Sequence, residues 1–334
     1  MIPHNLPTIG IEEEEAALRV LRSKQISQDK EVELFENEFC EYIGLPHGSA
    51  VALSSGTSSL FLALKILNAK EKKVTFPGYV CSALRHAVAM AGGIEKTVDI
   101  TTNSPNIEMS SIASSDISII PHMYGLPIQI DNTDNLVIED CCQALGAKVN
   151  NMMVGLQGDV GIFSFYATKL MTSGGQGGMF ISKNKDYVDA VKDYREFDYR
   201  NDTKNRFNFK MTDLQAAIGR EQLKKLPNFL KRREEIFQYY KKAGLDLLDV
   251  PEEQLNFLKP VRFRAIIKTS NPNKIIQSLS SIHVKAIIPT EDWELLGPQD
   301  SFPNGLKLSH ETVSIPIYPS LTNNDLDHIL SGIL

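Results

Sequence analysis

The chain has 334 residues, 42% of them hydrophobic and 23% charged, with a formal net charge of −6. This length predicts one large domain and one smaller one. The acidic balance, without a basic stripe, argues against nucleic-acid binding. Residues 1–8 lack the pattern of a signal peptide, and no apolar run approaches the roughly 20 residues that span a bilayer. We therefore expect a cytoplasmic protein that does not enter a membrane.

The four cysteines do not form a metal-binding pattern. Cys141 and Cys142 are adjacent, and Cys40 and Cys81 stand alone, without a CxxC or a Cys/His spacing. Zinc ligands usually come in such spaced groups. The cysteines are therefore interpreted as small buried side chains in a reducing compartment, and no metal is expected.

The predicted elements alternate between helix and strand. Helical periodicity first predicts helices at 12–22 and 32–42. A strand at 50–53, a turn of small residues at 54–58 and a helix at 60–67 follow. The next segments are then predicted as a helix at 83–91 and strands at 73–76, 117–121, 135–139, 160–165 and 178–181. This alternation predicts an α/β domain with a mainly parallel sheet, in which ligands lie beyond the carboxyl ends of the strands.

The last third of the chain predicts a second, smaller α/β domain. Residues 214–244 form a charged helical stretch, interpreted as a solvated helix face. Beyond it, strands are expected at 261–267, 284–288 and 313–317, and helices at 273–281 and 324–334. We place the large domain at 1–225 and the small domain at 226–334.

Two segments favour a site for an anionic, ring-containing ligand. Residues 55–58 read Ser-Gly-Thr-Ser at the start of a helix, where free N–H groups favour an anion, although Ser and Thr are also ordinary helix caps. The apolar strand before Asp140 places its carboxylate at the ligand edge of the sheet. There Asp140 could pair with a protonated pyridine nitrogen, with Gln143 near the ring oxygen, or it could simply cap a helix.

A third segment contains a lysine in an unusual position. Lys169 follows the aromatic run 163–166 and precedes a glycine-rich turn at 174–178, and Ser164 lies five residues earlier. A desolvated amine there can act as a nucleophile and proton carrier. The turn could also be a hairpin or a phosphate loop, but neither GxGxxG nor GxxxxGK[ST] is present in it. A dinucleotide or Walker site is therefore poorly supported.

Together these segments resemble the DegT/DnrJ/EryC1/StrS aminotransferases, pyridoxal 5′-phosphate (PLP) enzymes that aminate keto sugars. The resemblance extends from residue 9 to about 240 and returns at 314–321. It includes the Ser-Gly-Thr turn, residues 76–79 (FPGY), residues 98–100 (VDI), and the blocks around Asp140 and Lys169. The resemblance implies the PLP-transferase fold, with a mostly parallel seven-stranded sheet flanked by helices.

The resemblance also implies roles for individual residues. Lys169 would hold PLP as a Schiff base, and Asp140 and Gln143 would contact its ring. The remaining cofactor contacts in one chain would be Ser55, Gly56, Thr57, Tyr79 and Ser164. Asn208, which precedes a helix expected to begin near Thr212 or Asp213, would reach the cofactor phosphate of a neighbouring copy, which implies a homodimer.

The sequence departs from the family pattern in four places. Cys81 stands where an aromatic ring commonly stacks on the cofactor, so that Tyr79 or another residue would have to cover that face. Gln176 replaces Glu, and Lys210 replaces Arg. The C-terminal part is short, with residues 288–293 (IPTEDW) in place of the usual His-Tyr and Pro-Leu-His stretch.

The implied activity is transfer of an amino group from L-glutamate to a keto sugar, nucleotide-linked, in the synthesis of surface polysaccharides or other amino sugars. A smaller keto compound is the alternative acceptor, and an inactive PLP-binding homologue is the alternative class. Family members that act as sugar dehydratases have His in place of the lysine, so Lys169 favours transamination. A Rossmann dehydrogenase is disfavoured by the missing glycine fingerprint.

Overall fold

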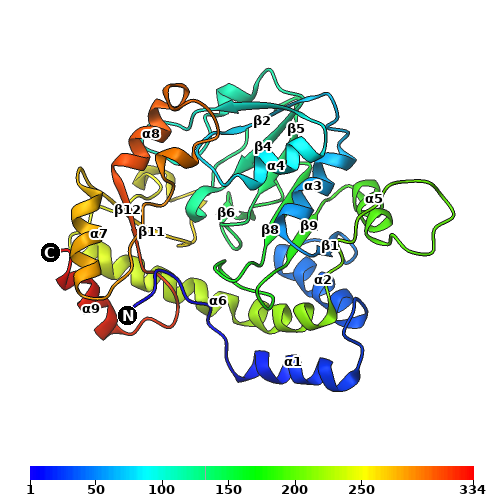
Figure 1. Cartoon of the computed structure of the whole chain (residues 1–334), viewed down its shortest axis with the longest axis horizontal. Helices are drawn as coiled ribbons and strands as arrows, with labels where there is room; N and C mark the ends of the chain where they lie inside the picture. The colour runs from blue at the N-terminus through cyan, green and yellow to red at the C-terminus, as the bar shows by residue number, and fades with distance from the viewer. Residues whose placement is uncertain (132) are drawn as a thin grey trace.

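The protein is described by a computed structural model that covers residues 1–131 and 133–334. Its centre is a seven-stranded sheet in the order β1-β9-β8-β5-β4-β2-β3 (Figure 1). The strands are β1 Ala50–Leu53, β2 Lys73–Pro77, β3 Ile94–Val98, β4 Ile117–Pro121, β5 Leu136–Asp140, β8 Val160–Ser164 and β9 Gly178–Ile181. β9 pairs antiparallel with β1 and β8, and the other neighbours pair in parallel. The predicted mostly parallel seven-stranded sheet is confirmed.

The inner strands are apolar because helices cover the sheet on both faces. The helices of this part are α1 Ile11–Ser23, α2 Lys30–Ile43, α3 Gly56–Ile66, α4 Ala83–Met90, α5 Lys185–Arg195 and α6 Asp213–Lys242. α3 packs on β8 and β9, and α2 and α5 pack on β1. α3 is buried over most of its length, which explains the apolar run at 60–64 within it. Of these six helices, α5 was not predicted.

β3 was also missed by the sequence reading. It pairs only with β2 and forms an edge of the sheet. Two of its five residues, Glu95 and Lys96, are charged, and the strand is largely exposed. An edge strand of this kind carries little of the apolar signal by which the inner strands were recognised.

The C-terminal elements form a small antiparallel sheet with helices beside it. They are β11 Ala265–Lys268, β12 Thr312–Ile315, α7 Pro272–Ser281, α8 Pro303–His310 and α9 Asn323–Ser331. A further three-stranded sheet consists of β6 Lys148–Val149, β7 Met152–Met153 and β10 Leu258–Lys259. Short 3-10 helices lie at η1 Met109–Ile112, η2 Met123–Gly125, η3 Glu252–Gln254, η4 Asp292–Glu294 and η5 Gln299–Ser301.

The strand predicted at 284–288 is wrong. Only isolated bridges occur there: Val284 pairs with Ile2, and Ile287 pairs with Ser314. Because the two bridges go to different partners on different segments, no continuous ladder forms. The strand predicted at 261–267 also begins later, at Ala265, where pairing with β12 starts.

α6 connects the two parts of the molecule (Figure 1). Thr212 caps it through a reciprocal pair of contacts with Gln215. Leu223 and Leu226 belong to the main hydrophobic core, whereas Ile236 and Phe237 belong to a second core with β11, β12 and α9. The predicted division between residues 225 and 226 falls inside this helix and stays a prediction. No helix within the described residues is long and apolar enough to cross a membrane.

Candidate active site

A cavity of about 230 Å³ opens where β4, β5 and β8 end and α3 begins. This is the carboxyl edge of the parallel sheet, where ligands of such folds bind. Seven of the nine residues predicted to hold the cofactor line it: Ser55, Gly56, Thr57, Asp140, Gln143, Ser164 and Lys169. These residues come from three separate segments, 55–57, 140–143 and 164–169, and the fold brings them to one place.

The first turn of α3 fits a phosphate group. Ser55 caps the helix by accepting a hydrogen bond from the Ser58 N–H at 3.0 Å, which leaves the first N–H groups of the turn without intrahelical partners. A Cβ atom on Gly56 would lie 2.8 Å from Ser164 Cβ, so only glycine fits here. The helix start and the Ser164 hydroxyl therefore border one narrow space suited to an anion.

The other side of the cavity fits a ring with a basic nitrogen and a phenolic oxygen. Asp140, 8% exposed at the end of β5, accepts a hydrogen bond from the Cys142 N–H at 3.0 Å. Its second oxygen is left for a ligand. Gln143 accepts from the Tyr124 N–H at 2.8 Å. This bond fixes the Gln143 amide so that its NH₂ group can donate to an oxygen in the cavity.

Lys169 stands in a loop that is tied at several points. Its own N–H donates to the Tyr166 carbonyl at 2.9 Å, and Asn5 donates to the Thr168 carbonyl at 2.9 Å. Lys169 Nζ lies 5.4 Å from the centre of the Phe263 ring. The backbone around the lysine is therefore held by a local bond and by the N-terminal segment, while within the described residues no carboxylate lies within 4.0 Å of the amine.

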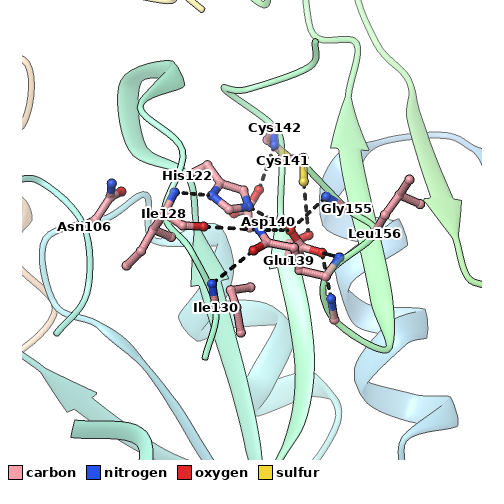
Figure 2. A network of polar contacts seen from close by, with 12 residues as sticks. Asn106, His122, Ile128, Ile130, Glu139, Asp140, Cys141, Cys142, Gly155 and Leu156 are labelled. Atoms are coloured by element: carbon pink, nitrogen blue, oxygen red, sulfur yellow. Dashed lines mark hydrogen bonds and ion pairs between the residues drawn. The ribbon is translucent and has the colours of Figure 1, made fainter. Parts of the chain in front are cut away.

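Directly beside Asp140, Glu139 forms a closed network that we call the Glu139 network (Figure 2). The fully buried Glu139 carboxylate accepts five hydrogen bonds, at 2.6–3.3 Å, from His122 Nε2, Gly155 N, Gly158 N and both nitrogens of Gln157. Burial by itself would raise the pKa of Glu139, but these donors outweigh it and hold the pKa below its ordinary value.

The Glu139 network also defines the state of His122, which lines the cavity. His122 Nδ1 accepts from the Ile128 N–H at 3.2 Å, so that Nε2 carries the proton donated to Glu139. His122, Glu139 and Cys141 lie close enough to resemble a metal-binding group. Because the Glu139 oxygens are already occupied by hydrogen bonds, we interpret the group as structural.

Neither cysteine next to Asp140 behaves as a nucleophile. Burial, followed by the nearby charge of Asp140, raises the pKa of Cys142 well above its ordinary value. Burial also raises the pKa of Cys141. Both side chains are therefore protonated at neutral pH, and a protonated thiol is a poor nucleophile.

Two predicted residues lie outside the cavity. Tyr79 is fully buried, and its hydroxyl bonds to the Tyr124 hydroxyl at 2.9 Å. Its ring does not line the cavity, and its predicted contact with the cofactor stays a prediction. Asn208 is exposed, and its side chain accepts a hydrogen bond from the Lys210 N–H at 3.1 Å. Its predicted role toward a neighbouring copy stays a prediction.

The structure locates three of the residues that depart from the family pattern. Cys81 and Gln176 line the cavity, and the lining rings there are those of Tyr166 and His122. Lys210 is engaged elsewhere, with its Nζ 3.1 Å from Glu196. Sequence reasoning missed the part of His122 in the site. A buried histidine whose glutamate partner lies 17 residues further on gives no local signal.

The fold and the cavity together define a PLP-dependent aminotransferase. The family model described as the DegT/DnrJ/EryC1/StrS aminotransferase family matches residues 7–334. The chain therefore belongs to this family, as the sequence motifs predicted. The cavity fits the cofactor on its own evidence, since the Gly56 turn suits a phosphate and Asp140 and Gln143 keep free hydrogen-bonding capacity.

Individual relatives agree with this assignment. The chain is 27% identical to the spore coat polysaccharide biosynthesis protein SpsC of Bacillus subtilis, covering 99% of this chain and 96% of the relative. It is 32% identical to a UDP-4-amino-4,6-dideoxy-N-acetyl-beta-L-altrosamine transaminase of Campylobacter jejuni, covering 72% and 69%. The alignment with SpsC extends over 381 positions although this chain has 334 residues. SpsC therefore contains internal segments that this chain lacks.

A solved structure shows the same fold. The aminotransferase TlmJ of Streptoalloteichus hindustanus superposes with a TM-score of 0.90 at 22% identity, covering 100% of this chain and 98% of TlmJ. At this identity the likeness establishes the fold alone.

Proposed function

We propose that the protein transfers the amino group of L-glutamate to the keto group of a nucleotide-linked sugar, in the synthesis of surface polysaccharides or other amino sugars. The observation that carries this proposal is the meeting of Lys169, Asp140 and Gln143 with the start of α3 in one cavity. The names of the relatives, a polysaccharide biosynthesis protein and a transaminase of an amino sugar linked to UDP, support the sugar as acceptor.

PLP, when bound, supplies an electron sink that stabilises negative charge on the carbon losing a proton. The residues of the chain do the rest. Asp140 would pair with the ring nitrogen and favour its protonated form. The turn at Gly56 and the Ser164 hydroxyl would hold the phosphate. Lys169 Nζ would hold the cofactor, and its amine would also serve as general base and acid for the proton that is moved.

The site is proposed to be completed by a second copy of the chain. Asn208 and the neighbouring Phe207 are both exposed, Phe207 at 58%. The carbonyl of Phe209, the residue directly before Lys210 of the Leu53–Lys210 bridge, accepts from the Ser54 N–H at 2.8 Å. The segment thus runs along the surface beside the start of α3. We propose a homodimer in which Asn208 contacts the partner's phosphate site, in the cytoplasm, where four free thiols fit a reducing environment.

The first experiment is the visible absorbance of the purified protein, before and after addition of L-glutamate. We expect an absorbance of the lysine-bound cofactor that L-glutamate bleaches and a keto acceptor restores. A band that ignores glutamate would contradict the donor but not the cofactor. The absence of any band after soaking with PLP would contradict the proposal as a whole.

A smaller keto compound is the second candidate acceptor, and one feature favours it. The segment 290–296 is tied to the chain just before the cavity lining, since the Leu296 N–H donates at 2.9 Å to the carbonyl of Gly78, two residues before Val80. Glu291, Asp292 and Glu294 add negative charge to this segment. Such charge disfavours a diphosphate. A comparison of turnover with a nucleotide-linked keto sugar and with the free keto sugar separates the two candidates.

A further inference from the structure

Lys169 borders a second, much smaller cavity besides the one that fits the cofactor. Its volume is about 10 Å³, which is room for about one water-sized ligand. The N-terminal segment forms part of the wall with Thr8, and α6 forms another part with Gln222 and Arg233. A ligand in this cavity would therefore bridge the start of the chain and the helix that connects the two parts of the molecule.

Arg233 is a buried cation whose hydrogen bonds are incomplete. It is 2% exposed, and its Nη1 donates to the carbonyls of Arg262, Phe263 and Ile317 at 2.7–3.3 Å. Its Nε is buried and has no hydrogen-bond partner within the described residues. Within the same residues, no carboxylate lies within 4.0 Å of the guanidinium. Burial lowers the pKa of Arg233 to about 10, so that the group is still charged at neutral pH.

Thr8 contributes a second incomplete group to the wall. Its hydroxyl oxygen is buried and, in the part of the chain that the structure describes, has no hydrogen-bond partner. Gln222 is satisfied, since it donates to the Thr8 carbonyl at 2.8 Å and to Glu13 at 2.7 Å. Thr172 is satisfied too, because its N–H donates to Gln222 at 3.3 Å and its hydroxyl to the Phe165 carbonyl at 3.2 Å. The Thr8 hydroxyl is therefore able to engage a ligand in the cavity.

The two incomplete groups favour an anion over a water molecule. Arg233 Nε can only donate a hydrogen bond, and the Thr8 hydroxyl can donate as well. A water molecule that accepted from both would in turn need acceptors for its own two hydrogens. Gln222 and Thr172, the other hydrogen-bonding side chains of the wall apart from Lys169, are already engaged. An anion only accepts, and it also compensates the buried positive charge.

The surroundings of Arg233 carry further positive charge. Arg264 Nη1 lies 3.3 Å from His4 Nε2, and within the described residues no carboxylate lies within 4.0 Å of that guanidinium either. Burial, and then neighbouring cations that include Arg264 and Arg233, lower the pKa of His4 to about 3. Glu13 is already compensated, because its carboxylate lies 2.7 Å from Lys225 Nζ. The local field therefore attracts a small negative ion.

We propose that this cavity binds a single chloride ion, held by Arg233 Nε and the Thr8 hydroxyl. The volume of about 10 Å³ is too small for phosphate, sulfate or a carboxylic acid, so that a monatomic anion is the class of ligand that fits. The ion joins the N-terminal segment to α6 beside Lys169. It requires neither cofactor nor substrate, so that a failure of amino transfer would leave it standing.

Bromide, a heavier halide, locates the ion directly. Crystals of the cofactor-loaded wild type, grown with sodium bromide in place of sodium chloride, should give an anomalous peak between Arg233 Nε and Thr8 Oγ1. Absence of this peak overturns the proposal, whether the electron density there shows a water molecule or nothing.

The melting temperature in solution gives an independent test. In about tenfold excess over its dissociation constant, chloride should raise the Tm by about 2 °C or more relative to gluconate, which is too large for the cavity, at the same ionic strength. Thr8→Val keeps the shape without the hydroxyl and should lose most of this difference. Thr312→Val is the matched control, because the buried Thr312 hydroxyl donates to the Leu308 carbonyl at 2.6 Å, outside this cavity. It should be less stable in both salts and keep the full difference.

The salt comparison also distinguishes a chloride site from a hydroxyl that is merely unpaired. Without a ligand in the cavity, Thr8→Val would remove an unsatisfied buried group and would be at least as stable as the wild type in chloride. That result, or equal melting temperatures of the wild type in the two salts, overturns the proposal. If Thr8→Val does not fold, the bromide crystals of the wild type decide. Wild-type protein without any cofactor absorbance contradicts the proposed function instead, and its melting temperature still reports on chloride.

Discussion

Glu139 and Asp140 are neighbours on β5, yet they serve opposite purposes. The Glu139 carboxylate is closed off by five hydrogen bonds from its own chain, whereas Asp140 accepts one and turns its free oxygen toward the cavity. Successive side chains of a strand point to opposite faces, which separates the two. A buried charge whose bonds are complete maintains the structure, and one whose bonds are incomplete is ready for a ligand. Lys169, which also lines the cavity, belongs with Asp140 in this respect.

The largest effect is expected at Lys169, which belongs to the residues that face the ligand. Lys169→Ala should reduce amino transfer by about 10³-fold or more, because both the covalent contact and the proton carrier are lost. The free energy of unfolding of this variant should change by less than about 1 kcal/mol. Within the described residues, the lost side chain contributes only a cation–π contact with Phe263. Steady-state kinetics and urea unfolding measure the two quantities. Full activity in the variant would contradict the assignment of the lysine.

The largest loss of stability is expected from a change in the Glu139 network. Glu139→Ala leaves three buried backbone N–H groups and His122 without an acceptor, which should lower the free energy of unfolding by about 3–5 kcal/mol. Glu95→Ala is the control, because Glu95 forms a partly exposed pair with Arg85 and should cost no more than about 1 kcal/mol. Equal losses in the two variants, measured by urea unfolding, would break the comparison.

Gly56→Ala should affect the cofactor more than the fold. The new methyl group would approach Ser164 Cβ to 2.8 Å and narrow the phosphate space. We expect PLP binding to weaken about tenfold to a hundredfold, in line with about 1–3 kcal/mol of overpacking. Gly305→Ala is the control, since a Cβ there meets its neighbours at an ordinary 3.4 Å or more. Titration of the apoprotein with PLP, followed by absorbance, gives the two affinities.

The smallest effect concerns pH. The pKa of Glu139 is lower in the folded protein than in the unfolded chain, so its contribution to stability is present above the unfolded pKa and is lost as the pH falls through the folded pKa. The free energy of unfolding should therefore decrease more steeply on acidification in the wild type than in Glu139→Gln. Identical slopes for the two proteins would show that the carboxylate is not held in its charged form.

The sequence predicted the residues that face the ligand better than it predicted the Glu139 network. Asp140, Lys169 and the Gly56 turn lie in short motifs at the ends of strands, and such motifs are legible without a structure. The backbone N–H groups that donate to Glu139 lie 16–19 residues further along the chain, in a loop without periodicity. Arg264 meets His4 and Ser314 only through the fold. Contacts between distant segments leave no trace in local periodicity.

α6 bears on how the protein unfolds. The helix is 30 residues long and gives buried side chains to both hydrophobic cores. If either core unfolded, apolar side chains of this helix would be exposed to water. The remaining half of the helix would be poorly stable alone. The two parts should therefore melt together in one cooperative transition rather than as separate units. A fragment ending at residue 225 would end inside this helix, and we expect it to be insoluble.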